Sequence, residues 1–295
     1  DAAILRTGGQ TQIMTTDHLR SLTADPVIMT RIAAVHALGD AWAMGAAPQA
    51  ATATIILPRM SSEMLRRTLA EIMQTAHTVM GDAGAAIVGG HSSLGDELTI
   101  GFAITGLCDA DPITISGAKP GDVLILTKPI GSGVLMAAEM AGQARGADVA
   151  SALSLMTTGQ AKAAQILHGA HAMTDVTGFG LVGHLSGICE ASGVDAIIDL
   201  DAVPWMDGAL DLAIAGVRSS LFKDNQSGAG PVFGADGPKG DLLFDPQTAG
   251  GLLAAIDGGQ ANGVLWSLQA AGYPAAIIGQ IQAGDGAVTV QTKPA

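Results

Sequence analysis

The sequence predicts a mixed α+β fold with α/β layers, divided into two domains. The length of 295 residues favours two domains over one. Hydrophobic residues make up 48% of the chain and charged residues 14%, so there is enough apolar material for a core and disorder is not expected. The segment 109–121 carries the Asp, Pro and Gly residues of a linker. We therefore predict an N-terminal domain at 1–110 and a C-terminal α/β domain at 111–295.

The first half carries the patterns of two helices among strands. Pro26 suits the first turn of a helix, and Gly45 and Pro48 end it. His36 and Asp40 are one turn apart, so they share a face of this helix. We expect a second helix at 61–80, strands at 11–16, 51–57, 85–88 and 98–107, and a polar loop at 89–96.

The second half alternates strand and helix patterns, which favours layers of both kinds. The Gly-, Ser- and Pro-rich residues 219–240 are predicted to form a loop. We expect strands at 122–127, 172–174, 195–200, near 242, and at 252–256, 275–281 and 287–291, with helices after 133 and at 180–191, 206–215 and 260–271.

The acidic composition excludes several partners. The formal net charge is −13, which repels DNA, RNA and anionic membranes, so neither a nucleic acid nor a membrane is a predicted partner. The sequence has no transmembrane-length apolar run and no signal peptide. Cys108 and Cys189 form no disulfide framework, and we expect both to be buried and inert. These features predict a cytoplasmic protein.

Three aspartates, Asp17, Asp40 and Asp175, lie where apolar segments meet glycine-rich sequence. A carboxylate beside a core segment is costly unless something pairs with it. A divalent cation that holds phosphates is one such partner, which makes a metal–nucleotide site the first hypothesis. The sequence lacks the Walker glycine-rich motif, so a nucleotide has to be held in another way.

Each of these features also has a structural explanation. Asp40 and His36 could form a local hydrogen-bonded pair on their helix. Asp175 could equally be the N-cap of the helix that follows it. His91 in Gly89-Gly90-His91-Ser92 could satisfy the backbone of its own loop, and Asp245 could make an Asx contact within a turn. The remaining histidines have no metal-ligand spacing and are expected to be structural or on the surface.

In combination, these motifs resemble selenide, water dikinase (selenophosphate synthetase), of the superfamily that contains aminoimidazole ribonucleotide synthetase. The resemblance covers essentially the whole chain. Thiamine-phosphate kinase and the hydrogenase maturation factor look alike at the first motif, and the others are more specific to the selenium branch. The motifs are His36-Ala-Leu-Gly-Asp40 with Ala43-Met44-Gly45-Ala46, then Gly89-Gly90-His91-Ser92, Leu126–Gly131, Met173–Gly180 and Asp245–Gly251.

The resemblance implies an ATP-dependent reaction that converts selenide and water to selenophosphate, with release of AMP and phosphate. It implies that Asp1, Asp40 and Asp175 hold Mg²⁺ around the ATP phosphates, and that Asp17 lies at the nucleotide. Phosphoryl transfer needs charge neutralisation more than covalent protein chemistry, so these aspartates are expected to hold metal and no catalytic residue is predicted in the chain.

The resemblance also implies a homodimer whose N-terminal domains build a β-barrel together. Gly90, His91 and Ser92 match a loop that the partner chain lends to the nucleotide. In that arrangement the active sites lie beside the dimer interface.

The chain departs from the family at its start. The family carries a Cys or selenocysteine with a nearby Lys in a glycine-rich segment that would lie upstream of Asp1, and neither Cys108 nor Cys189 matches it. Because the chain begins at Asp1 without Met, we expect a fragment with sequence missing upstream. The sequence of residues 92–98 resembles that of relatives fused behind a flavin-type oxidoreductase domain, so such an upstream domain is a predicted partner.

Two other functions stay open. One is a different ATP-using synthetase of the same superfamily, which acts on a carbon or sulfur substrate. The other is a dimerising nucleotide-binding module that lacks catalysis.

Overall fold

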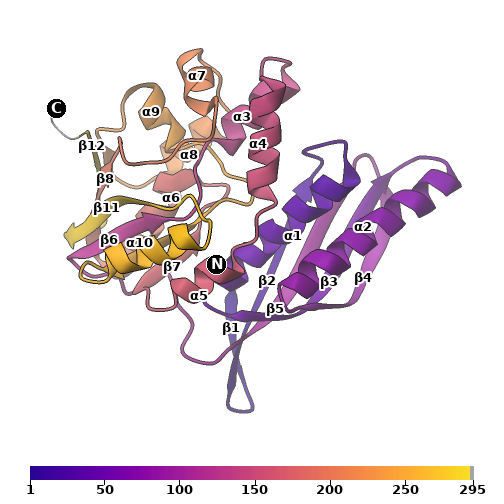
Figure 1. Ribbon diagram of the computed structural model, residues 1–295, viewed down its shortest axis with the longest axis horizontal. Coiled ribbons are helices and arrows are strands. Elements are labelled where there is room, and N and C mark those ends of the chain that lie inside the picture. Colours follow the sequence, from indigo (N-terminus) through magenta and orange to yellow (C-terminus); the bar gives the residue numbers. More distant parts are fainter. Residues whose placement is uncertain (293–295) are drawn as a thin grey trace. The chain divides into compact units, whose positions relative to one another are not determined.

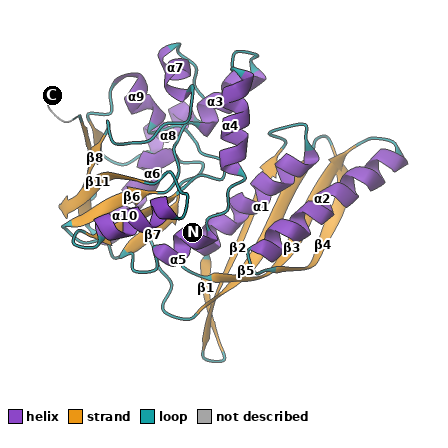
Figure 2. Ribbon diagram, viewed as in Figure 1, coloured by secondary structure: helices purple, strands orange, loops and turns teal. Residues whose placement is uncertain are grey.

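The structure, a computed structural model, describes residues 1–292 and divides into two compact units. The first unit contains Asp1–Pro112 and Met156–Ala161, and the second contains Ile113–Leu155 and the described residues from Lys162 onward. Each unit is a sheet with helices packed on it (Figures 1 and 2). The assignment of ATP binding and dimerisation to 1–110 stays a prediction, and the last three residues of 111–295 lie outside the described residues.

The first unit is a five-stranded sheet in the order β1-β2-β5-β3-β4, antiparallel except for the parallel pair β3–β4. Helices α1 and α2 lie side by side over this sheet (Figure 2). The elements are β1 (Ala3–Thr7), β2 (Gln10–Arg20), α1 (Pro26–Ala43), β3 (Ala47–Pro58), α2 (Ser62–Asp82), β4 (Ala86–Gly95) and β5 (Thr99–Cys108).

Helix α1 begins and ends where the sequence predicted. The Asp25 carboxylate caps its start by accepting from the backbone N–H groups of Val27 and Ile28, at 2.8 and 3.1 Å. Gly45 has a φ of +66°, which lets the chain turn away after the helix. Nearly every residue of α1 from Met29 onward is buried, because this helix packs on both α2 and the sheet.

The polar loop predicted at 89–96 is wrong, because these residues continue strand β4 to Gly95. The glycine pair marks a register shift between β3 and β4, at Ala51 and Thr52. Gly90 has a φ of +154°, and a Cβ there would lie 2.1 Å from the carbonyl oxygen of Ala53. Glycine is therefore used for close backbone approach inside a strand, which sequence alone does not distinguish from a turn.

The second unit is a seven-stranded sheet in the order β7-β10-β6-β11-β8-β12-β9. Strand β12 is parallel to β8 and β9, and the other pairs are antiparallel. The strands are β6 (Asp122–Leu126), β7 (Ala172–Asp175), β8 (Val194–Asp199), β9 (Val232–Phe233), β10 (Leu252–Asp257), β11 (Ala276–Ala283) and β12 (Val288–Gln291). The helices are α3 (Ser132–Met140), α4 (Gly146–Met156), α5 (Ala161–Ile166), α6 (Gly180–Ser192), α7 (Ala209–Ile214), α8 (Phe222–Gly228), α9 (Gly237–Leu242) and α10 (Ala261–Ala270).

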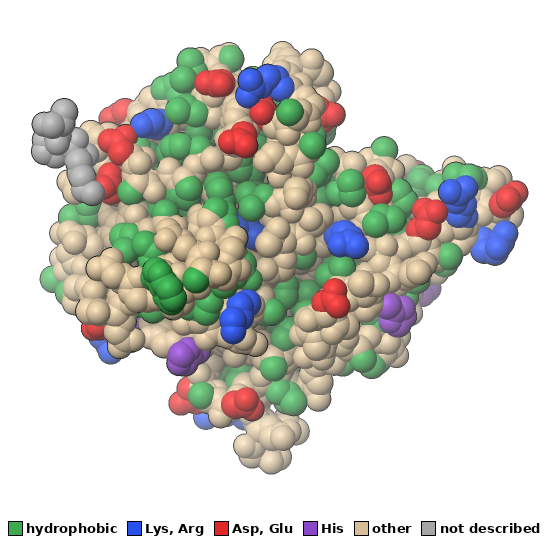
Figure 3. All heavy atoms as spheres, viewed as in Figure 1, with side chains coloured by type: hydrophobic (Ala, Val, Ile, Leu, Met, Phe, Trp, Pro, Cys, Tyr) green, Lys and Arg blue, Asp and Glu red, His purple; other side chains and the backbone are tan. Residues whose placement is uncertain are grey.

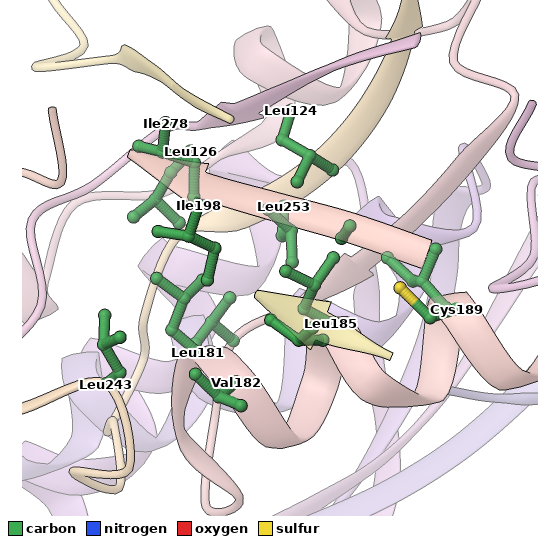
Figure 4. Packing of buried hydrophobic residues seen from close by; sticks show 14 of the residues in the cluster. Leu124, Leu126, Leu181, Val182, Leu185, Cys189, Ile198, Leu243, Leu253 and Ile278 are labelled. Carbon is green, nitrogen blue, oxygen red and sulfur yellow. The ribbon is translucent and has the colours of Figure 1, made fainter. Parts of the chain in front are cut away.

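Helix α6 packs its apolar face on this sheet, and the side chains between them form the core of the unit. In Figure 4, Leu181, Leu185 and Cys189 of α6 face Leu126 and Leu253 of the strands. All five side chains are fully buried. This face fixes α6, and with it the loop that joins β7 to α6.

The two cysteines differ. Cys189 is buried as expected, and burial raises its pKa to about 12, so the thiol is inert. The expectation that Cys108 is buried is wrong, since it is only half-buried at the end of β5, although burial and the neighbouring Asp109 still raise its pKa.

Two predictions for the second unit are wrong. Residues 219–240 are not one loop, because they contain α8, β9 and the start of α9. The strand expected near Leu242 is the end of helix α9. These elements are short and rich in glycine, and long-range contacts hold them. Asn225 of α8, for example, donates to the carbonyl oxygens of Gly178 and Phe244 at 2.8 and 2.9 Å.

The helices of residues 1–292 include none that is both long and apolar enough to cross a membrane. On the face shown in Figure 3, acidic and basic side chains are interspersed among uncharged ones.

Candidate functional site

A polar cluster in the first unit joins β2 to the second half of α1. Thr15 and Asp17 alternate along β2 and therefore point to the same side of the sheet, while His36 and Asp40 share one face of α1. The Thr15 hydroxyl donates to Asp40 Oδ2, and His36 Nε2 lies 3.1 Å from Asp17 Oδ2. The backbone N–H of His18 also donates to Asp17, at 3.0 Å. His36 thus contacts Asp17 across the sheet–helix interface, where the sequence suggested a local pair with Asp40.

The two carboxylates of this cluster have pKa values shifted in opposite directions. Burial acts to raise the pKa of Asp17, but the hydrogen bond and positive charge of His36 outweigh it and leave the pKa below its ordinary value. Burial raises the pKa of Asp40; the Thr15 hydroxyl opposes this rise and the Asp17 carboxylate adds to it. Asp40 is therefore the carboxylate whose ionised form most needs a further positive partner.

Asp1 lies beside Asp40 within the same unit. Strand β1 pairs with β2 from Ala3 opposite Met14, which brings the first residue next to the Thr15 region. Asp1 and Asp40 each offer a carboxylate oxygen, and the two atoms are within 4.8 Å of one another. The donors are all oxygen atoms, and one of the two carboxylates is partly buried, so this part of the unit fits a hard divalent cation such as Mg²⁺.

Gly90, His91 and Ser92 lie away from this cluster within a single chain. They occupy the middle of β4, and β3 and β5 separate β4 from β2 in the sheet order. All three are exposed on an edge strand. Any contact with the nucleotide of the same chain would have to cross these two strands, since β4 and β2 are roughly 14 Å apart at the usual spacing.

In the second unit, Asp175 is the last residue of β7 and is buried. It lies opposite Leu252 of β10. The alternative that Asp175 caps α6 is wrong, because the N-cap position of that helix belongs to Phe179. The loop between them turns at Gly180, whose φ is +74° and where a Cβ would lie 2.8 Å from the backbone of Phe244.

A buried lysine accompanies Asp175. Lys128 follows β6, is 1% exposed, and donates from Nζ to the carbonyl oxygen of Ala249 at 2.9 Å. Burial lowers the pKa of Lys128 to about 7, and the negative charge of Asp175 opposes this change. Gly251 lets the two backbone segments approach closely, because a Cβ at this position would lie 2.6 Å from the backbone nitrogen of Lys128 and 3.1 Å from its Cβ.

No role for Thr15 or Lys128 was predicted from the sequence. The alternation of β2 signalled that Thr15 shares a face with Asp17. Lys128 stood in one of the quoted motifs, but its contacts reach Ala249, 121 positions away, and no local pattern indicates them.

Comparison with known proteins identifies the family. Residues 1–108 match the N-terminal domain of the AIR synthase related proteins, and residues 119–291 match their C-terminal domain. Selenide, water dikinase of Myxococcus xanthus (strain DK1622) is 36% identical over 302 residues, covering 98% of this chain and 84% of that protein. Selenide, water dikinase of Aeromonas hydrophila is 38% identical over 296 residues, with 97% and 84% covered.

Solved structures agree on the fold. Thiamine-monophosphate kinase from Stenotrophomonas maltophilia K279a superposes with a TM-score of 0.75 at 21% identity, covering 98% of this chain and 88% of that one. Hydrogenase maturation protein HypE in complex with ATP has a TM-score of 0.74 at 20% identity, with 99% and 85% covered. The fold is thus that of the AIR synthase related proteins. Within them, the chain belongs to the selenide, water dikinase family, as the sequence motifs predicted.

Proposed function

We propose that this chain is the core of an ATP-dependent enzyme that makes selenophosphate from selenide and water and releases AMP and phosphate. Its substrates are then selenide and ATP. The identity of 36–38% to selenide, water dikinases over nearly the whole chain carries this proposal. The two free cysteines, one half-buried and one buried, are compatible with the reducing cytoplasm in which we expect the enzyme to work.

The site chemistry supports a Mg²⁺-dependent reaction. Asp1 and Asp40 would hold the ion from the first unit, with Asp17 at the nucleotide. We propose that Asp175 of the second unit completes the ligand set. When bound, Mg²⁺ neutralises charge on the ATP phosphates. The protein's part is to hold these carboxylates ionised, which Thr15 and His36 favour through their contacts with Asp40 and Asp17.

Calorimetry of Mg-ATP binding tests the site. Asp40→Ala is expected to abolish measurable binding, because it removes the most strongly desolvated carboxylate of the cluster. The exposed Asp82, at the end of α2, provides the matched control Asp82→Ala, which should bind as the unchanged chain does. Unchanged affinity in Asp40→Ala would remove the site assignment.

Product analysis tests the reaction. Selenide-dependent formation of AMP and selenophosphate is expected, and carbon or sulfur acceptors should not replace selenide. AMP release with another acceptor would favour a different synthetase of the superfamily. Tight Mg-ATP binding with no acceptor-dependent AMP would favour the nucleotide-binding module.

We also propose that the protein is a homodimer that uses the sheet of the first unit. Strand β4 is an edge strand of ten residues, and most of its side chains are exposed, with Val88 at 67% and Leu94 at 53%. A long exposed edge with apolar side chains is a template for pairing with another chain. Since Gly90, His91 and Ser92 lie on it, dimerisation would carry them to the partner's nucleotide.

The oligomeric state tests this part independently. Sedimentation velocity should give a dimer for the unchanged chain and a monomer for Val88→Lys/Leu94→Lys, in which charges oppose edge pairing. The exposed Trp266 on α10 of the second unit offers a control, because Trp266→Lys should leave the dimer intact. A dimer that survives both β4 substitutions would show that this edge is not the interface.

A further inference from the structure

Residues on both sides of Asp175 are hydrogen-bonded to one histidine of α6. The backbone N–H of Thr177 donates to His184 Nε2 at 3.0 Å, and the Thr177 hydroxyl lies 3.2 Å from the same nitrogen. On the other side, Thr174 Oγ1 lies 3.4 Å from His184 Nδ1. His184 therefore contacts the residue before Asp175 and the residue two positions after it.

These partners assign the tautomer of the ring. A backbone N–H can only donate, so Nε2 of His184 must offer a lone pair to Thr177. The single proton of the neutral ring is then on Nδ1, directed at Thr174 Oγ1. The Thr174 hydroxyl donates onward to the carbonyl oxygen of Asp175, which lies 3.2 Å away. The direction of donation is thus fixed from His184 through Thr174 to the backbone of Asp175.

The surroundings keep this ring neutral and in place. Burial lowers the pKa of His184, which favours the uncharged form. The ring of Phe179 packs against it, with centroids 5.6 Å apart and planes tilted by 52°. A charged imidazole would turn an N–H of Nε2 towards the N–H of Thr177 and lose that hydrogen bond.

The rest of the loop is held from other directions. The backbone N–H of Gln247 donates to the carbonyl oxygen of Thr177 at 2.9 Å. Asn225 donates to the carbonyl oxygen of Gly178 at 2.8 Å. These contacts hold the loop after Val176, and the hydrogen bonds of His184 reach the residues on either side of Asp175.

We propose that His184 is a positioning residue: its Nδ1-protonated ring holds the Thr174 hydroxyl and the Thr177 backbone N–H, on either side of Asp175, and so sets the direction in which that carboxylate meets the Mg²⁺-nucleotide. The role of Asp175 in this statement rests on the proposed function. The hydrogen-bond arrangement does not, and it can be tested by itself. Partners of this kind orient ligands in many metal sites, and their loss commonly weakens metal binding 10- to 100-fold.

The first experiment observes the ring directly. Long-range ¹H–¹⁵N spectra of the ¹⁵N-histidine-labelled chain at neutral pH distinguish a protonated Nδ1 from a protonated Nε2, and the signals that vanish in His184→Gln assign the residue. We expect Nδ1 protonated and Nε2 unprotonated. A ring protonated at Nε2 would overturn the inference, whatever the function of the protein.

The second experiment measures Mg-ATP affinity by calorimetry in a set of variants. His184→Gln keeps an acceptor near the position of Nε2 and should bind within about threefold of the unchanged chain. His184→Leu keeps bulk without an acceptor and should bind about tenfold or more weakly. His168→Leu, at an exposed histidine of the same unit, is the control and should have no effect.

The Asp175→Asn background separates the two proposals. If His184 acts through Asp175, His184→Leu should add little to the loss caused by Asp175→Asn. Normal Mg-ATP affinity in Asp175→Asn would remove Asp175 from the proposed site and leave the ring result intact. A loss in Asp175→Asn with normal affinity in His184→Leu would overturn the positioning role alone. Equal losses from His184→Leu in both backgrounds, or an unfolded His184→Gln chain, would mark a general structural residue and overturn it as well.

Discussion

Gln247 accepts a hydrogen bond from the hydroxyl of Ser132, 3.2 Å away, across 115 positions of the chain. The same Oε1 atom accepts from the backbone N–H groups of Gly131 and Ser132, at 2.9 and 3.2 Å. The N-cap residue of α3 is Gly131, which has no side chain to satisfy the first turn. A side chain from the segment before β10 therefore caps α3.

This cap predicts that substitution of Gln247 strongly lowers the free energy of unfolding, although the sequence pattern predicts only a turn at this position. Gln247 is 2% exposed, so Gln247→Leu would leave buried donors of α3 without an acceptor. We expect a loss of roughly 2–4 kcal/mol in the free energy of unfolding, measured with urea. Gln143→Leu, at an exposed glutamine, should change it by less than about 0.5 kcal/mol. Equal stability of the two variants would contradict the capping role.

Asp245, beside Gln247, predicts how stability depends on pH. Burial raises its pKa from 3.8 to about 7; hydrogen bonds from Val134, Gln247 and Gly133 oppose the rise. Because the folded state holds this proton more tightly than the unfolded state, stability falls as pH rises from about 4 to about 7 and then levels off. The difference between the two pKa values corresponds to roughly 4 kcal/mol.

Asp245→Asn tests that dependence, since an amide keeps an acceptor for the N–H of Gly133 but does not ionise. Urea unfolding at pH 5 and pH 8 should show a smaller fall in stability for the variant than for the unchanged chain. The comparison uses the difference between the two pH values, so a uniform loss of stability does not affect it. Parallel pH dependence in the two proteins would show that Asp245 is not the titrating group.

Long elements such as α1 and α2 were predictable from sequence, whereas the short helices α8 and α9 were not. Helix α1 carries its own signals, with a capping Asp25, Pro26 in the first turn and glycine after the end. Helix α8 and helix α9 are seven and six residues long and lack such periodicity. Contacts from distant segments, such as that of Asn225 to Phe244, stabilise them, and a local pattern contains no trace of these contacts.

Some residues of the candidate site were likewise predictable from sequence, and others were not. Asp17, Asp40 and Asp175 could be predicted as candidate site residues because each carboxylate lies beside an apolar segment, where an unpaired charge is energetically costly. His184 and Lys128 could not, because a histidine inside an apolar helix and a lysine after a strand have many ordinary explanations. The roles of His184 and Lys128 follow from their hydrogen bonds to Thr177 and Ala249, which the fold brings close to them.

Asp40 predicts opposite effects on stability and on binding. Its carboxylate is desolvated and lies near that of Asp17, so in the ligand-free protein the charge opposes folding. Asp40→Asn keeps an acceptor for the Thr15 hydroxyl and should leave the ligand-free melting temperature unchanged or higher, while Mg-ATP binding falls about 100-fold or more. Differential scanning fluorimetry with and without Mg-ATP measures both quantities. A variant that melts lower without ligand and shifts normally with Mg-ATP would contradict this account of the carboxylate.

Gly90 and Gly89 form a matched pair of positions in β4. A Cβ at Gly90 would lie 2.1 Å from the carbonyl oxygen of Ala53 in β3, and the φ of +154° is itself unfavourable for other residues. At Gly89 the nearest atom is 4.0 Å away, in the side chain of Thr52. Gly90→Ala must therefore push β4 off β3 at the bulge, whereas Gly89→Ala fits.

We expect Gly90→Ala to lower the free energy of unfolding by roughly 2–4 kcal/mol and Gly89→Ala by less than about 1 kcal/mol, measured with urea. Hydrogen exchange should localise the first loss to the amides that join β3 and β4, because β3 is the strand with which the edge strand β4 pairs. A Gly90→Ala chain as stable as Gly89→Ala would mean that the glycine at this position serves the ligand or the partner chain and not the strand pairing.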